Sequence, residues 1–332
     1  MGVWHNGEIG EFFALRDTAG RILNVSDGGV LYAEGKYHWY GQALGDAPYH
    51  PDGASGGQTT RTGVVMYGSE NLTDWEFEGV ILPVSSDPDH PLYAPMRMER
   101  PKIVYNEKTG MYVLWCHYVA YPGDHGVGVG GGEAGVAVCD RVNGRYTWVG
   151  HTRPIDGVSA VRDCTLYKDR DGTAYFVYDR DESVTLGEQK RALHIVKLSE
   201  DYLRPTREYK RIEGGFHREA PALLCRGGYY YMVTSGLTGW ACNGARVLRA
   251  KSLFGEWEDM GDPCVDDREQ TTFRTQTTFV FRLEGEEERF VHMAERHNTA
   301  NFLHCSYVWL PLHFAEDRLF LAYEKEWEIF HK

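Results

Sequence analysis

One short pattern recurs five times along the chain: a polar residue, an apolar run, a glycine-containing turn and a second apolar run. In the copy that begins at Glu219, the first run ends at the turn Gly227-Gly228, and a run rich in Tyr and Val follows. Glycine adopts positive φ at little cost, so this arrangement predicts a β-hairpin. Glu219 is then expected at the mouth of the first strand of that hairpin.

The other four copies have the same order of elements. The polar residues that open the five copies are Asp27, Glu99, Asp163, Glu219 and Gln276. They lie 56 to 72 residues apart, and a hairpin repeat with so long a period is typical of propeller blades and not of a solenoid. We therefore predict an all-β fold, a five-bladed β-propeller. It is expected to form a single domain over residues 1–332, with blades starting near 27, 99, 163, 219 and 276.

The charge and the ends of the sequence restrict partners and location. A net charge of −13 argues against nucleic acid or an anionic membrane surface as partner. No stretch approaches 18 consecutive apolar residues, so no membrane span is expected. The N-terminal residues lack the basic start and apolar core of a signal peptide, and the seven cysteines are scattered without a Cys-x-x-Cys pair. We expect a cytoplasmic protein with reduced thiols.

The five polar residues are candidates for chemistry because the first strand of each propeller blade lines the central channel. They are predicted to form one ring of equivalent side chains at one face, and four of them are acids. Acids packed so closely need raised pKa values or nearby counter-charges. The candidate counter-charges are Arg100, Arg162, Arg218 and Arg274. Acids held in different environments supply the proton donor and the base of general acid–base catalysis, although such a ring can also simply bind channel water or an ion.

Two further motifs argue against cofactors. The histidines show no His-Glu-x-x-His spacing, so no catalytic metal is predicted, while a structural ion in the central channel stays open. The glycine-rich stretch 125–132 superficially resembles a phosphate-binding loop, but no Lys-Ser/Thr and no helix start follow it. We predict a loop there and no required cofactor.

Several segments together resemble a known family. They are Asp27–Tyr32, Glu99–Asn106, Arg218–Ala222, Thr238–Trp240, Phe273–Thr278 and Tyr307–Leu312. In this order, from about residue 15 to residue 315, they resemble glycoside hydrolase family 43, and most closely its exo-β-1,3-galactanase-like branch. The resemblance implies a five-bladed propeller and an inverting hydrolase.

The resemblance also implies roles for particular residues. The catalytic acid of the family maps to Glu219, and the acid that tunes its pKa maps to Asp163. In most of the family an Asp at the position of Asp27 is the general base. The galactanase-like branch has Gly there and is thought to use a Gln that matches Gln276, with a nearby Glu that matches Glu99.

Sugar-contacting positions follow from the same resemblance. They are Glu99, Gln42, Tyr121, Thr238, Trp240 and Arg274. The chain departs from the branch at Gln42, where Glu is usual, and at Glu295, where Asp is common. These departures concern the substrate more than the reaction.

The residues and the resemblance lead to the same predicted activity. Inverting hydrolysis needs two carboxyl groups about 6.5–9.5 Å apart, and Asp27 and Glu219 open blades that are not neighbours in a ring of five. We predict an exo-acting glycosidase that releases a terminal sugar, most simply galactose from a β-1,3-galactan-like oligosaccharide or polysaccharide. The alternatives are an arabinofuranosidase, xylosidase or galactofuranosidase, or a non-catalytic glycan-binding propeller. Asp27 is preferred to Gln276 as the base, because an amide accepts a proton only through its rare imidic tautomer.

Overall fold

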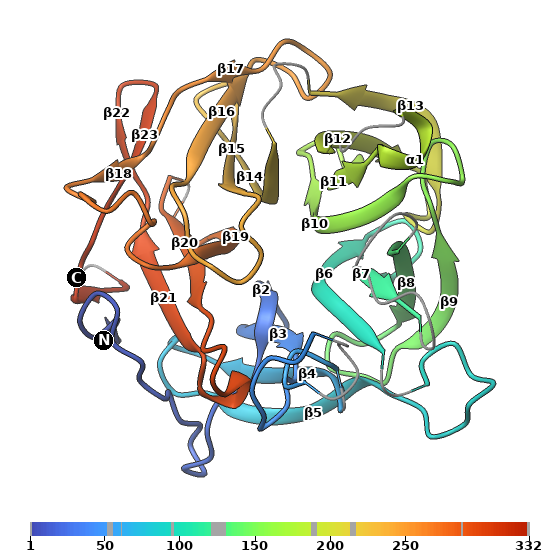
Figure 1. Ribbon diagram of the computed structural model, residues 1–332. Helices are drawn as coiled ribbons and strands as arrows, with labels where there is room; N and C mark the ends of the chain where they lie inside the picture. The colour runs from blue at the N-terminus through green and yellow to red at the C-terminus, as the bar shows by residue number, and fades with distance from the viewer. Residues whose placement is uncertain are drawn as a thin grey trace.

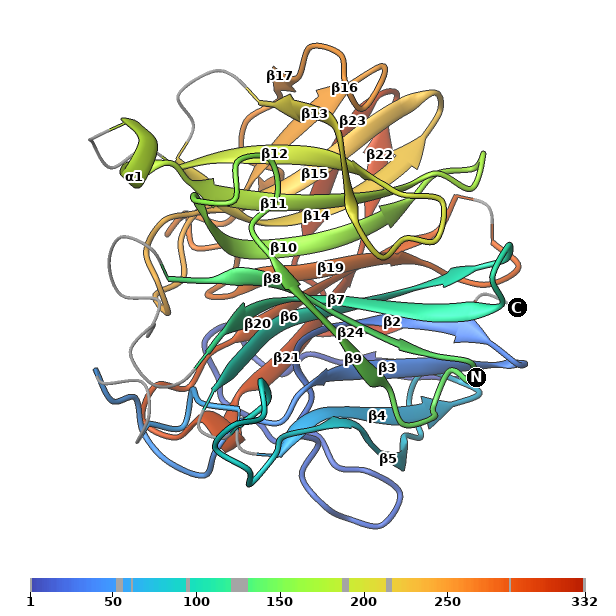
Figure 2. The same cartoon turned by 90° about the vertical axis from the view of Figure 1, so that its right-hand side faces the viewer.

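The computed structural model describes residues 2–51, 56–60, 62–93, 96–120, 131–186, 191–212, 217–286 and 288–330. Sheets built from consecutive strands surround a common centre (Figure 1). Their strands run across the thickness of the molecule, from the side that carries the short helix α1 (Ser183–Leu186) to the opposite side (Figure 2). The only other helix in the described part is the 3₁₀ turn η1 (Phe302–His304).

Four sheets contain four antiparallel strands each, in chain order. The first comprises β2 (Ser26–Ala33), β3 (Lys36–Gln42), β4 (Gly63–Ser69) and β5 (Glu76–Pro83). The second comprises β6 (Arg97–Asn106), β7 (Met111–Val119), β8 (Glu133–Cys139) and β9 (Thr147–Thr152). The third comprises β10 (Ala160–Lys168), β11 (Ala174–Asp181), β12 (Arg191–Leu198) and β13 (Pro205–Arg211). The fourth comprises β14 (Arg218–Arg226), β15 (Tyr229–Gly236), β16 (Arg246–Ala250) and β17 (Glu258–Asp259).

Two further sheets contain three strands each. The fifth consists of β19 (Gln276–Arg282), β20 (Phe290–Arg296) and β21 (Ser306–Pro311). The sixth consists of β18 (Cys264–Val265), β23 (Arg318–Ala322) and β22 (His313–Ala315). The first strands of the first five sheets contact one another around the centre, in the closed order β2, β6, β10, β14, β19.

The predicted number of blades is therefore wrong: the described chain forms six such sheets and not five. The all-β, single-domain propeller architecture agrees with the prediction. The sixth sheet lies at the outer rim beside β21 (Figure 1), and its buried Leu319 and Leu321 pack into the core shared by the fourth and fifth sheets. The sequence repeat does not reveal this sheet, because β18 has two residues and pairs in parallel with β23 from the far end of the chain.

The five predicted hairpins are all present, and their turns explain why. Each turn carries a glycine at positive φ, for example Gly35 at 85° and Gly172 at 81°. These turns lie at the end of the hairpin that faces away from the strand mouths. The polar residues that open the first strands are thereby placed together at the other end.

The N-terminal and C-terminal segments of the chain pair with each other. β1 (Val3–His5) pairs with β24 (Glu326–Glu328), and the buried Asn6 bonds to the backbone of Trp309 on β21 through both its amide atoms. Trp4 stacks on Trp309 with ring centroids 4.1 Å apart. The N-terminus thus completes the packing of the fifth sheet. No helix of the described residues is long and apolar enough to cross a membrane.

Candidate active site

A β-bulge marks the mouth of each of the first four inner strands. Two consecutive residues of the inner strand oppose one residue of the second strand in each of these sheets. The residue after the last regular pair has positive φ in three of them: 58° at Asp27, 53° at Arg100 and 53° at Ala220. In the first sheet the other bulge residue must be glycine, because a Cβ on Gly28 would lie 1.5 Å from the carbonyl oxygen of Tyr40. Bulges of this kind redirect side chains, here toward the channel mouth.

The bulges show that the predicted ring residues are not equivalent. Glu99 and Glu219 occupy the regular pair before the bulge, opposite His117 and Ser235. Asp27 and Asp163 lie inside their bulges, one and two residues farther along. The structure therefore corrects the expectation of five equivalent side chains. The different backbone positions give each acid its own partners.

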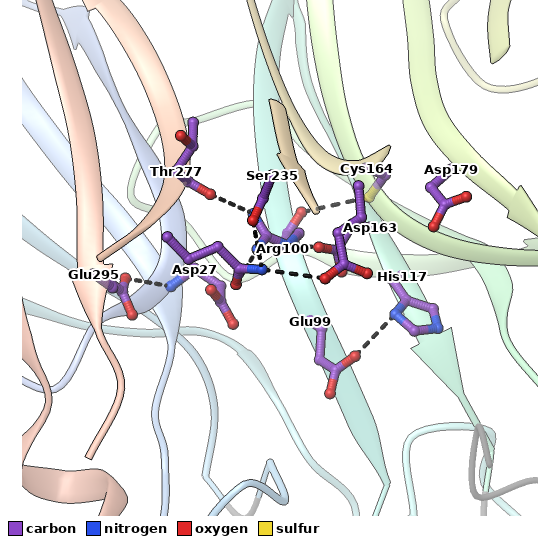
Figure 3. Close-up of polar contacts among 12 residues, drawn as sticks. Asp27, Glu99, Arg100, His117, Asp163, Cys164, Asp179, Ser235, Thr277 and Glu295 are labelled. Carbon is purple, nitrogen blue, oxygen red and sulfur yellow. Dashed lines mark hydrogen bonds and ion pairs between the residues drawn. The ribbon is translucent and has the colours of Figure 1, made fainter. Parts of the chain in front are cut away.

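Arg100 lies at the centre of the site and contacts residues from two other inner strands (Figure 3). Its Nε lies 2.9 Å from Asp163 Oδ2, and its Nη2 donates to Gln276 Oε1 at 2.9 Å. Burial opposes its charge, but the carboxylates of Asp163, Asp27 and Glu219 hold the pKa of Arg100 above its usual value. One buried guanidinium thus faces three of the predicted catalytic acids.

Glu219 has the environment of a proton donor. It is buried, its Oε2 accepts from Arg191 Nη2 at 3.0 Å, and its Oε1 accepts from Gln276 Nε2 at 3.3 Å. Burial, followed by the negative charge of Asp163, raises the pKa of Glu219 to about 8. This carboxyl group therefore keeps its proton at neutral pH.

Asp27 has the opposite environment. Burial alone would raise its pKa, but contact with His297 and the charges of Arg100 and Lys102 hold the pKa of Asp27 well below its usual value. Gln42 Nε2 donates to Asp27 Oδ2 at 3.1 Å, and His297 Nε2 lies 3.6 Å from Asp27 Oδ1. The carboxylate is therefore available in its charged form over the whole neutral range.

Glu295 lies directly behind Asp27. It accepts from the Asp27 backbone N–H at 2.6 Å (Figure 3). It also accepts from the Ser26 hydroxyl at 2.5 Å. Burial, and then the charge of Asp27, raise the pKa of Glu295. Asp27, Glu295 and His297 each offer a ligand atom within 4.8 Å of the others, the one such group found among the described residues. A cation in the channel, which the sequence left open, would be held by these three.

The predicted sugar-contacting residues fall into two groups. Glu99 is paired with Arg97 and His117, and although its burial opposes the charge, these neighbours lower its pKa to about 2. Gln42 lies between Asp27 and Thr60, whose hydroxyl donates to Gln42 Oε1 at 2.9 Å. Both therefore belong to the buried network around the channel mouth.

The second group lies nearer the surface. Trp240 is half-buried and packs edge-on against His297, with ring centroids 4.9 Å apart, so it is linked to Asp27 through that histidine. Thr238 is exposed and bonds to Ala241 and Asn243. Arg274 is exposed and forms an ion pair with Glu269. Tyr121 lies outside the described residues.

The predicted counter-charges are distributed differently from the expectation. Arg100 has that role, whereas Arg162 pairs with Asp181 and Arg274 with Glu269. Arg218 donates to the carbonyl oxygens of Thr234 and Gly244. Four further groups around the site were not predicted from the sequence, namely Arg191, Asp179, Lys102 and His297. Asp179 had a detectable signal, because it directly continues the apolar run of β11.

Comparison with known proteins decides the family. The family model for glycosyl hydrolases family 43 matches residues 25–320. The chain belongs to glycoside hydrolase family 43. It is therefore a glycoside hydrolase, and hydrolases of this family invert the anomeric configuration, as the resemblance implied. A search of curated protein sequences found no match.

Solved structures agree with this assignment. A GH43 β-1,3-galactosidase in complex with galactodeoxynojirimycin is 30% identical, with a TM-score of 0.85, and the match covers 97% of this chain and 100% of that one. An exo-β-1,3-galactanase from Clostridium thermocellum is 30% identical, with a TM-score of 0.80, and the match covers 99% and 67%. An exo-β-1,3-galactanase from Phanerochaete chrysosporium, 23% identical with a TM-score of 0.81 over 99% and 69%, shares the fold. The resemblance to the galactanase-like branch is confirmed.

Proposed function

We propose that this hydrolase removes terminal galactose from β-1,3-linked galactans by an inverting mechanism, with Glu219 as general acid and Asp27 as general base. One observation carries the assignment of roles. The environments of the two carboxyl groups move their pKa values apart, upward at Glu219 and downward at Asp27. Such a pair supplies a proton donor and a proton acceptor at the same pH.

The galactose specificity is supported by the relatives. The β-1,3-galactosidase that matches over its whole length was solved with galactodeoxynojirimycin, and the bacterial exo-β-1,3-galactanase is equally similar in sequence. Trp240 is partly exposed, and its ring packs at a right angle against His297, the histidine that lies next to Asp27. A sugar ring presents C–H groups that pack on such a ring, so Trp240 is assigned to the terminal galactose.

The reaction follows from these positions. Glu219 protonates the glycosidic oxygen as the bond to the anomeric carbon breaks, so the leaving sugar departs as a neutral alcohol. Asp27 takes a proton from the attacking water on the opposite face, and the product has the inverted α configuration. Gln276 is a weaker base because its Oε1 already accepts from the Arg100 guanidinium and its Nε2 only donates. It is assigned to sugar binding and to holding Glu219.

The decisive experiment replaces Glu219 by Gln. Glu219→Gln is expected to lower the turnover of β-1,3-galactobiose by about 10²–10⁴, because the leaving sugar needs a proton. Hydrolysis of 2,4-dinitrophenyl β-galactoside, whose phenolate leaves without protonation, is expected to fall far less. NMR of the first product from the wild-type enzyme reports the anomer.

Glu78→Gln is the matched control, because Glu78 is a largely buried, ion-paired glutamate of the first sheet whose partners are Lys36 and His38. It should leave both substrates unaffected. An equal loss on both substrates in Glu219→Gln would remove Glu219 from the role of acid. Faster cleavage of nitrophenyl arabinofuranoside, xyloside or galactofuranoside than of the β-galactosides would instead overturn the choice of sugar.

A further inference from the structure

Asp179 is a buried acid close to Glu219. The roles described so far belong to Glu219, Asp27 and Asp163, and none of them involves Asp179. It lies on β11, opposite the two-residue bulge formed by Arg162 and Asp163 on β10. Its side chain is completely buried, and its Oδ2 forms an ion pair with Arg191. Its Oδ1 has no hydrogen-bond partner among the described residues. A charge in such a position is costly unless its partner is held firmly.

Arg191 joins Asp179 to the catalytic acid. Asp179 is directly opposite Leu193 on β12, and Arg191 lies two residues before Leu193, so the two side chains are diagonal neighbours on one face of the third sheet. The same Nη2 atom that pairs with Asp179 donates to Glu219 Oε2 at 3.0 Å, across to the fourth sheet. The Asp179–Arg191 ion pair of the third sheet thus contacts the catalytic acid Glu219 of the fourth sheet.

This contact has a chemical consequence for a protonated Glu219. Both oxygens of Glu219 accept a hydrogen bond, and the charge-assisted bond from Arg191 to Oε2 at 3.0 Å is stronger than the bond from Gln276 to Oε1 at 3.3 Å. Oε2 is therefore the carbonyl-type oxygen, which is the better acceptor of the two oxygens of a protonated acid. The proton is then carried by Oε1. The neighbour of Oε1 is the Nε2 of Gln276, which also donates and cannot accept that proton. The O–H group is left to the glycosidic oxygen of the substrate.

The opposite charges of Arg191 and Asp179 have opposite effects on the protonation of Glu219. An unopposed guanidinium beside Glu219 would favour the ionised carboxylate, which cannot act as an acid. Burial, against the opposing charge of Arg191, raises the pKa of Asp179 to about 7. Asp179 is therefore negative above that pH, where Glu219 would otherwise lose its proton, and its charge there opposes the effect of Arg191. The charged groups that face Glu219 are Asp163, Arg191, Asp179 and Arg100.

We propose that Arg191 and Asp179 are positioning residues for the catalytic acid: Arg191 fixes the orientation of the Glu219 carboxyl group, and Asp179 cancels the charge of Arg191 so that the proton stays on Glu219. The inference rests on the proposed role of Glu219. It goes beyond that role because it assigns a function to an ion pair from the neighbouring sheet.

The first test is the pH profile of Asp179→Asn. This change removes a negative charge and leaves Arg191 unopposed, and both effects lower the pKa of Glu219. The basic limb of kcat/KM for β-1,3-galactobiose is therefore expected to move down by about one pH unit. In the double variant Asp179→Asn/Arg191→Met both charges are absent, and the limb should return toward the wild-type position. A basic limb that stays in place or moves up in Asp179→Asn would overturn the proposal.

The second test uses the leaving group and does not depend on the folding of the first variant. Arg191→Met removes the donor that orients Glu219, so the loss on β-1,3-galactobiose should exceed the loss on 2,4-dinitrophenyl β-galactoside by about tenfold or more. Arg249→Met is the matched control, because Arg249 is an ion-paired arginine of similar exposure, 13% against 17%, that binds Glu258 and Asp317. Equal losses on both substrates in Arg191→Met would overturn the proposal.

The two roles can fail independently of each other. If Glu219→Gln loses both substrates equally, the assignment of the acid fails. If Glu219→Gln discriminates between the substrates while Asp179→Asn and Arg191→Met show neither effect, the assignment of the acid stands and the positioning role alone fails.

Discussion

Asp163→Asn tests whether the charge next to Glu219 controls its protonation. The Asp163 carboxylate lies 2.9 Å from Arg100, and after burial it is the largest contribution to the raised pKa of Glu219. Asn has nearly the same shape but no charge. The change therefore removes a negative neighbour and also releases the Arg100 charge to act on Glu219. Both effects lower the pKa of Glu219.

The magnitude follows from the geometry. A charge at this range moves a carboxyl pKa by about 1–3 units, and the 18% exposure of the Asp163 side chain favours the lower end. With a shift of about one unit, the pKa of Glu219 falls from about 8 to about 7. At pH 6 the protonated fraction stays above roughly nine tenths in both proteins, whereas at pH 9 it falls about tenfold in the variant.

The assay is kcat/KM for β-1,3-galactobiose between pH 5 and pH 9.5. The ratio of wild type to Asp163→Asn should be close to its minimum at pH 6 and should rise about tenfold toward pH 9. Asp156→Asn is the control, because Asp156 also pairs with a buried arginine, Arg180. A ratio that is the same at every pH would refute the reasoning, since it would assign Asp163 to binding or structure and not to the pKa of the acid.

Three further predictions concern the base, the sugar and the chain ends. Asp27→Asn should lower kcat by about 10²–10⁴, whereas Gln276→Ala should mainly raise KM; near-normal turnover in the first with a dead second variant would assign the attacking water to Gln276. Trp240→Ala should raise KM about tenfold with a smaller effect on kcat, and an unchanged KM would place the sugar elsewhere. Asn6→Ala should cost about 2–4 kcal/mol of unfolding free energy, because Asn6 is buried and bonds to Trp309; an unchanged denaturation midpoint would contradict this.

The hairpins and the chemical class of the site could be predicted from the sequence because both depend on local pattern. A glycine such as Gly172 is needed wherever the turn has positive φ, so each hairpin is visible in a few residues. The direction of the hairpin then places Glu219 at a strand mouth, and it does lie in the last regular pair before the bulge of β14. The same logic found Asp27, Asp163 and Gln276 as members of one site.

Only the tertiary structure decided what these local patterns do together. The sixth sheet depends on parallel pairing between Cys264 and Leu321. No local sequence pattern predicts that two strands so far apart in the chain pair with each other. The bulges shift Asp27 and Asp163 relative to Glu219, which a count from strand to strand does not detect.

The opposite pKa shifts of Glu219 and Asp27 also belong to the tertiary structure. They arise from burial and from charges on other sheets, including Arg100, Arg191 and His297. Electrostatic interactions depend on distance in space and on exclusion of water, so the sequence identified the acids but the packing of the sheets determined which one holds the proton.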